Sequence, residues 1–207
     1  GNPYNGTGEW SPASGATLTG SGGTIGRTVT VAFPDTPNGV DSASHATGVD
    51  SQSATITLYA NTPRVDIVDS IGKHAVASAE EGYFAFPFKE DSPTVTYDVN
   101  GTPVQLGLGQ IPGADMDNQA IGSYADISNG TGGVTVSTTD APLAEFGSLH
   151  DNHLIGRPGR LDSATVPAPT DLPTTGSFFS FVFNNLWITN YRQDQSGPIS
   201  YHYSITD

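Results

Sequence analysis

Apolar and polar residues alternate in short runs along most of this chain. Apolar residues alternate with polar ones at Val29 and Val31 in Thr24–Phe33, at Ile56 and Leu58 in Ser53–Ala60, and at Val65 and Ile67 in Arg64–Gly72, and all three runs are rich in β-branched residues. Residues that favour turns, mainly Gly, Pro, Ser and Asn, separate these runs from the segments that follow. This alternation and composition predict β-strands that bury one face.

Two further patterns give local detail. In Tyr83–Glu90 three Phe residues alternate on one face, and Pro87 predicts an edge or bulge position because proline cannot donate a ladder hydrogen bond. Asn100-Gly101 favours positive φ and therefore predicts a tight hairpin between the strands on either side.

Three later segments also have strand character. We expect one strand within Gly132–Gly147. The segments Ser177–Tyr191 and Gly197–Asp207 predict two long strands, paired antiparallel around a turn at Asp194–Pro198.

The whole pattern predicts an all-β fold with two packed antiparallel sheets, a large β-sandwich. No ten-residue run has the three-four apolar spacing of a helix. We expect one domain over residues 25–207. Residues 1–24, rich in Gly, Ser and Thr, are interpreted as a leading segment, a candidate mobile loop with Trp10 as its anchor. Leu149–Gly176 is the longest poorly patterned stretch, and such loops are usually functional, interfacial or mobile.

The charge balance excludes several classes of partner. Seven basic and 21 acidic residues give a net charge of −14, which disfavours binding to nucleic acid or to anionic membranes. An acidic surface of this kind favours a monomer. The chain has no cysteine, which excludes disulfides and Cys-ligated zinc. The compartment stays open, with a secreted or cell-surface location favoured over the cytoplasm.

Candidate chemistry is sparse. Glycoside hydrolysis needs two carboxylates about 5–10 Å apart, but the many aspartates carry no specific signal, and we expect structural or solvated roles for them. No nucleophile elbow, P-loop or dinucleotide-binding glycine motif is present, so no catalytic residue is predicted.

One short cluster contains potential metal ligands. His150, Asp151 and His153 fall within four residues of a loop, and Asp162 lies nearby. Two histidines and a carboxylate are a possible divalent-ion set, yet no helical motif supports the geometry, and solvent-exposed histidines are the favoured interpretation. The other histidines, including His74 and His202, stand alone in the sequence.

The amide- and aromatic-rich stretch Asn184–Gly197 is the best candidate for sugar contact. Aromatic rings stack on sugars, and Asn, Gln and Arg hydrogen-bond to hydroxyl groups. The candidate residues are Trp187, Asn190, Tyr191, Arg192 and Gln195. For Trp187 the alternative of a core position in a central strand buried on both faces is favoured. In that case nearby asparagines such as Asn184 would be hydrogen-bonded to backbone, as buried amides require.

Four longer segments occur in a fixed order along the chain. They are ATITLYANTPRVDIVDSI, FAFPF, GVTVSTTDAPLAEFG and FSFVFNNLWITNYRQDQSGPISYHYSIT. Together they resemble the C-terminal β-domain of glycoside hydrolase family 38, the α-mannosidase family, and especially its bacterial-type members. QIPGADMDNQAIGSYADISN resembles the stretch which that family carries between FPF and the DAPL strand. The similarity runs from about Ser53 to Asp207.

The resemblance implies a two-sheet supersandwich of the galactose-mutarotase-like type. It also implies a parent enzyme that cleaves α-mannosidic bonds with retention, using zinc held with the nucleophile in an N-terminal α/β domain. No catalytic or metal-ligating residue of that domain can be assigned here. We therefore expect an accessory β-domain, without activity of its own, that packs on and completes a catalytic domain and lends loop residues to a glycan cleft.

Two other function classes stay open. A stand-alone carbohydrate-binding module would use the aromatic and amide-rich turn at Tyr191–Gln195. A structural or adhesion domain would need no sugar ligand and could bind calcium through acidic loops.

Overall fold

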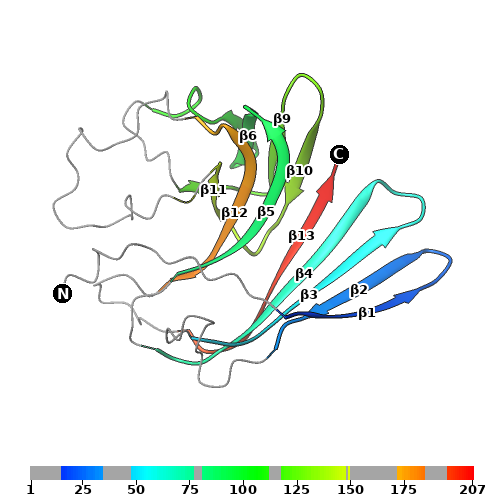
Figure 1. Ribbon diagram of the computed structural model, residues 1–207. Coiled ribbons are helices and arrows are strands. Elements are labelled where there is room, and N and C mark those ends of the chain that lie inside the picture. The colour runs from blue at the N-terminus through cyan, green and yellow to red at the C-terminus, as the bar shows by residue number, and fades with distance from the viewer. Residues whose placement is uncertain are drawn as a thin grey trace. The chain divides into compact units, whose positions relative to one another are not determined.

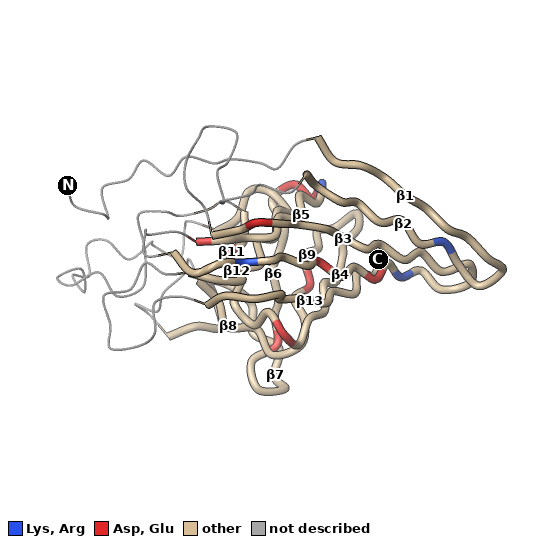
Figure 2. Tube along the Cα trace, turned by 90° about the horizontal axis from the view of Figure 1, so that it is seen from below, with Lys and Arg blue, Asp and Glu red and all other residues tan. Residues whose placement is uncertain are grey.

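The computed structural model describes residues 15–34, 48–76, 81–111, 118–147, 149, 172–184 and 195–207. All thirteen regular elements in these residues are β-strands, arranged in two antiparallel sheets of nine and four strands (Figure 1). This confirms the prediction of an all-β, two-sheet fold. The same residues contain no helix of the length and hydropathy needed to cross a membrane. Charged residues are few and scattered along the strands (Figure 2).

The chain divides into two compact units, Gly1–Gly82 with Phe183–Ser204 and Tyr83–Val182 with Ile205–Asp207. The expectation of one domain over residues 25–207 stays a prediction.

The first unit contains five neighbouring strands. Their order in the sheet is β1 (Thr17–Gly22), β2 (Gly26–Ala32), β3 (Val49–Tyr59), β4 (Arg64–Lys73) and β13 (Gly197–Thr206).

Sequence alternation gives β1–β4 two chemically different faces, because residues directly opposite each other on paired strands share a face. One cross-strand row on the apolar face consists of Leu18, Val31, Ala54 and Asp69. The opposite face mostly carries hydroxyl groups, among them Thr19, Ser21, Thr28, Thr30, Thr55 and Thr57.

The leading segment is only partly as predicted. A loop was expected, but Thr17–Gly22 form β1, a strand paired with β2 along its full length. All six residues of β1 are exposed, so no apolar pattern marks the strand in the sequence. Ladder hydrogen bonds to β2 order it instead. Residues 1–14, including Trp10, lie outside the described residues.

The second unit is a two-layer sandwich. One layer has the strand order β5 (Glu81–Asp91), β12 (Thr175–Asn184), β11 (Leu143–Phe146) and β8 (Gln119–Ala120). The other has the order β10 (Gly133–Ser137), β9 (Tyr124–Ser128), β6 (Thr94–Val99) and β7 (Thr102–Gln105).

Aromatic rings fill the interior of this sandwich. Phe86 on β5 and Phe146 on β11 each lie 5.7 Å, centroid to centroid, from Phe178 on β12. Phe146 also lies 6.2 Å from Tyr97 on β6, which connects the two layers. Phe178 and Ile127 are fully buried, and the burial of each such side chain stabilises the fold by roughly 1.5–3 kcal/mol.

Two local predictions are confirmed. β5 is an edge strand of the four-stranded sheet, which explains how Pro87 is tolerated. β6 and β7 form the predicted hairpin, with φ of 53° at Asn100 and 81° at Gly101. Both central residues adopt the left-handed conformation that a tight two-residue turn requires.

Two strand predictions are wrong. Gly132–Gly147 contains two strands, β10 and β11, in different sheets. Pro142 lies between them and lacks the N–H group that would extend either ladder. β12 and β13 are not a hydrogen-bonded pair, because β12 lies between β5 and β11, and β13 is in the other sheet. The position of β12 between β5 and β11 confirms that it is a central strand.

Candidate functional site

Most of the residues predicted to contact sugar lie outside the described residues. Gln195 is exposed, two residues before β13. Trp187, Asn190, Tyr191 and Arg192 lie outside the described residues, as do His150, Asp151 and His153. The part of the chain that is described contains no cluster of His, Asp and Glu able to hold a metal ion. The sugar-contact and metal hypotheses thus stay predictions.

Asp66 on β4 is the centre of the best-defined polar cluster in the first unit. The Tyr59 hydroxyl donates to its Oδ2 at 2.6 Å, and the Ser204 hydroxyl donates to its Oδ1 at 2.6 Å. Arg64 holds both oxygens through Nη2 and Nε, at 3.1 and 3.0 Å. The Arg64 guanidinium also lies 4.8 Å from the centre of the Tyr59 ring.

This geometry keeps Asp66 ionised. Partial burial raises the pKa of the carboxyl, but hydrogen bonds from Ser204 and Tyr59 and the charge of Arg64 outweigh it and lower the pKa below the ordinary value. Each carboxylate oxygen has two donor atoms within 3.1 Å, so the carboxylate joins β3, β4 and β13. An ionised carboxylate with these contacts accepts hydrogen bonds that link neighbouring strands and has no proton to donate.

The face of the four-stranded sheet opposite Phe178 carries a second cluster. Tyr83 on β5 and Phe181 on β12 stack with ring centroids 4.8 Å apart. The Tyr83 hydroxyl donates to Oε1 of Glu145 on β11 at 2.7 Å. Glu145 is only 2% exposed. Two aromatic rings beside a carboxylate resemble the chemistry of a sugar subsite.

A third cluster is an amide network in the interior of the second unit. The Tyr97 hydroxyl donates to Gln119 Oε1 at 2.7 Å, and Gln110 Nε2 donates to both of these oxygens, at 3.0 and 2.8 Å. Gln110 Oε1 accepts from the Gly107 N–H at 2.6 Å. Desolvation raises the pKa of Tyr97. The network satisfies buried polar atoms and connects β6 to β8.

Two carboxylates of the second unit also accept hydrogen bonds that stabilise strands and turns. Asp98 accepts from the Gly101 N–H at 2.6 Å and from Ser123 at 2.7 Å. Asp126 accepts from Ser128 and Thr135, at 2.7 and 3.0 Å. Asp66 and Asp126 thus have contacts that join strands within their own unit. Asn184 is half-buried, and its buried Oδ1 atom has no hydrogen-bond partner among the described residues.

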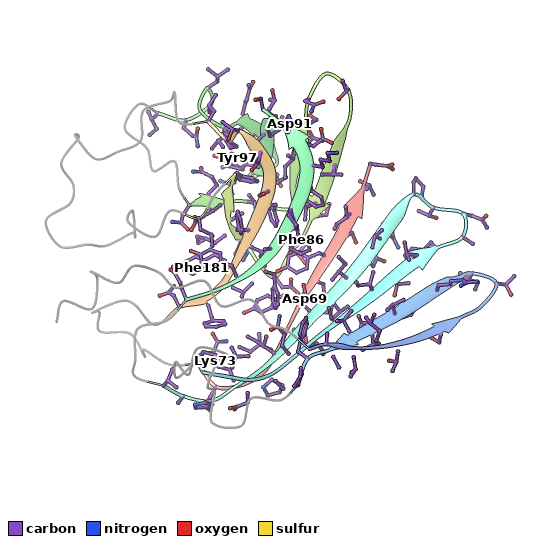
Figure 3. The ribbon with its side chains drawn as sticks, in the orientation of Figure 1. Asp69, Lys73, Phe86, Asp91, Tyr97 and Phe181 are labelled. Atoms are coloured by element: carbon purple, nitrogen blue, oxygen red, sulfur yellow. The ribbon has the colours of Figure 1, made fainter. Side chains whose placement is uncertain are left out.

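Asp69 on β4 differs from every other carboxylate described above. It is 7% exposed, and among the described residues its carboxylate has no hydrogen bond or ion pair. Burial raises the pKa of Asp69 to about 6. Figure 3 shows Asp69 and Lys73 on the same strand. The four-residue interval along a strand is roughly 13 Å, too long for an ion pair.

Sequence reasoning missed one pair. His74 appeared isolated, yet its Nδ1 lies 2.8 Å from Asp50 Oδ1. The partner comes from the neighbouring strand β3, 24 positions earlier, so only strand register could reveal it.

The comparisons with known proteins add no identification. No family model matches this chain, and no curated protein shows significant similarity to it.

Proposed function

We propose that this chain is an accessory β-domain of an α-mannosidase-like glycoside hydrolase, which packs on a catalytic domain and completes it. The observation that carries the proposal is the ordered set of segments similar to the β-domain of family 38. These segments fall on β3–β4, β5, β10–β11, β12 and β13, so the similarity follows the strands of both sheets. Because the similar segments are strands and not loops, the resemblance supports a structural role for this chain.

The use of polar side chains supports a scaffold role. Asp66, Asp98 and Asp126 each accept at least two hydrogen bonds from their own unit. A carboxylate that acts in acid–base catalysis must be able to exchange a proton with substrate. In this proposal the zinc ion and the nucleophile belong to the catalytic domain, and no residue of this chain is assigned to them.

Hydrolysis of an aryl α-mannoside tests the proposal. We expect no turnover by the chain alone and an increase in the activity or thermal stability of the parent catalytic domain when the chain is added. Robust turnover by the chain alone would contradict the proposal, as would a catalytic domain that neither binds the chain nor changes when it is present.

A carbohydrate-binding module is the second candidate, favoured by the Tyr83–Phe181 stack beside Glu145. Calorimetric titration with mannosides, xylans and glucans tests it. Binding that disappears in Phe181→Ala and weakens in Tyr83→Phe would support a subsite at this cluster. A chain that binds none of these sugars would exclude this second function.

A further inference from the structure

Two turns of the second unit contain the same tripeptide, Asn-Gly-Thr. One begins at Asn100 in the β6–β7 hairpin, and the other begins at Asn129 between β9 and β10. The side-chain carboxamide of an asparagine can react with the backbone nitrogen of the next residue, and a following glycine hinders this approach least because it has no Cβ. Since the tripeptides are identical, a difference in reactivity between the two sites comes from the fold. Asn5-Gly6 and Asn38-Gly39 lie outside the described residues.

Hydrogen bonds immobilise the Asn129 carboxamide. Its Oδ1 accepts from the Thr131 N–H at 2.8 Å, from the Thr131 hydroxyl at 2.7 Å and from the Gly132 N–H at 3.3 Å. Its Nδ2 donates to Glu90 Oε2 on β5 at 2.7 Å. The side chain has to break these bonds before its Cγ can turn toward the Gly130 nitrogen. Each broken bond adds to the barrier, so the fold protects Asn129.

Asn100 lacks these restraints. Its side chain is exposed and has no hydrogen bond among the described residues. The space beside the reacting nitrogen is also open, because an added Cβ at Gly101 meets no atom within 4 Å. The Gly101 N–H, which has to lose its proton in the reaction, donates to Asp98 Oδ1 at 2.6 Å. A carboxylate is therefore in position to accept that proton.

We propose that Asn100 is a site of spontaneous deamidation and that the fold protects Asn129 from the same reaction. The Gly101 nitrogen forms a bond to Cγ of Asn100 and passes its proton to Asp98. The Cγ–Nδ2 bond then breaks, and the amino group takes the proton back from Asp98 and leaves as ammonia. Water opens the resulting cyclic imide at either carbonyl carbon, which leaves aspartate or isoaspartate at position 100. Water is the only co-reactant, so the reaction goes beyond the proposed function and does not depend on it.

The product changes the β6–β7 hairpin, whose second strand is an edge strand. Isoaspartate adds a carbon atom to the backbone of a two-residue turn in which φ is 53° at Asn100 and 81° at Gly101. A tight hairpin turn requires both central residues in the left-handed conformation, and a longer backbone cannot keep Val99 opposite Thr102. Deamidation therefore weakens this hairpin irreversibly.

Peptide mapping by mass spectrometry tests the assignment, because it follows the conversion of amide to acid at each asparagine separately. The purified chain is incubated in mildly alkaline buffer, folded in one sample and unfolded in concentrated urea in the other. In urea we expect similar rates at Asn100 and Asn129, because their tripeptides are identical. In the folded chain we expect Asn100 to react at least about tenfold faster than Asn129. Equal rates in the folded chain, or a folded chain in which Asn100 does not react, would overturn the inference.

Two variants test the physical basis of the difference. Thr131→Ala removes one hydrogen bond from the Asn129 side chain at an exposed position, and we expect it to raise the rate at Asn129 about fivefold without changing the rate at Asn100. Asn100→Gly keeps a residue that accepts the left-handed conformation and has no side-chain amide. Incubation should lower the midpoint of thermal unfolding of the wild type and leave that of Asn100→Gly unchanged. An unchanged rate at Asn129 in Thr131→Ala, or the same fall in midpoint for Asn100→Gly and the wild type, would contradict the inference.

Discussion

The Tyr59 hydroxyl donates a 2.6 Å hydrogen bond to Asp66 Oδ2, and this bond joins adjacent strands β3 and β4. Ser204 on β13 donates to the other oxygen of the same carboxylate. One side chain therefore connects the consecutive strands β3 and β4 to β13, which lies 138 positions further along the chain. Because both hydroxyl groups donate to this one carboxylate, its loss releases both together.

Asp66→Ala is expected to destabilise the chain by about 2 kcal/mol, because it removes the acceptor of Tyr59 and Ser204. Tyr59→Phe removes one donor and should cost about half as much. Urea denaturation measures both free energies of unfolding. Equal stability of Asp66→Ala and the wild type would show that the cluster contributes nothing.

The same cluster predicts a loss of stability in acid. Hydrogen bonds and Arg64 lower the pKa of Asp66 in the folded chain, so the unfolded chain takes up the proton first. The contribution is present above the unfolded pKa of about 4 and disappears as the pH falls through the lower folded value. Denaturation from pH 5 to pH 2 should show this loss in the wild type and a smaller one in Asp66→Asn.

Asp69 predicts the opposite dependence on pH. Its pKa of about 6 in the folded chain is above the unfolded value, so the folded chain binds more protons between about pH 4 and pH 6. The penalty for burying the charge is full above pH 6 and declines as the pH falls to 4. Asp69→Asn should therefore stabilise the chain at pH 7.5 by about 2 kcal/mol. Asp91→Asn, at an exposed carboxylate on β5, is the control and should change stability little.

Gly101→Ala is expected to destabilise the β6–β7 hairpin by about 1 kcal/mol, because φ is 81° at this position. Gly130→Ala is the matched control. At both sites an added Cβ meets no atom within 4 Å, and only Gly101 has a left-handed backbone. Equal midpoints of thermal unfolding for the two variants would contradict the assigned turn.

Gln119→Leu should cost about 2 kcal/mol, because it leaves the buried Tyr97 hydroxyl and Gln110 amide without their shared acceptor. Gln105→Leu on β7 is the control, because the Gln105 side chain has no hydrogen bond within the described part of the chain. Urea denaturation compares the two. A similar cost for both variants would mean that the network does not stabilise the second unit.

The strand pattern was largely predictable from sequence, and the reasons are local. Alternation around Val29, Ile56 and Ile67 marked β2, β3 and β4, and Asn100-Gly101 marked a hairpin. Each of these signals acts within ten residues. The sequence did not predict β1, because this strand is ordered by its pairing with β2 and not by an apolar pattern of its own. It did not predict β8 or β9 either, although apolar and polar residues alternate in Tyr124–Ser128.

The candidate clusters were much less predictable. Asp66 and Ser204 are 138 positions apart, and Tyr83 and Glu145 are 62 apart. No sequence interval indicates such contacts, since they depend on which strands are neighbours and in what register.

The sequence by itself determined the all-β class, most strand positions and the acidic character of the chain, because periodicity, turn propensity and charge are properties of nearby residues. Only the tertiary structure decided that β12 and β13 belong to different sheets, that Asp66 joins three strands and that Asp69 is buried with no hydrogen-bond partner among the residues described. Strand order and register set these contacts, and both arise from packing between segments that are remote in the chain.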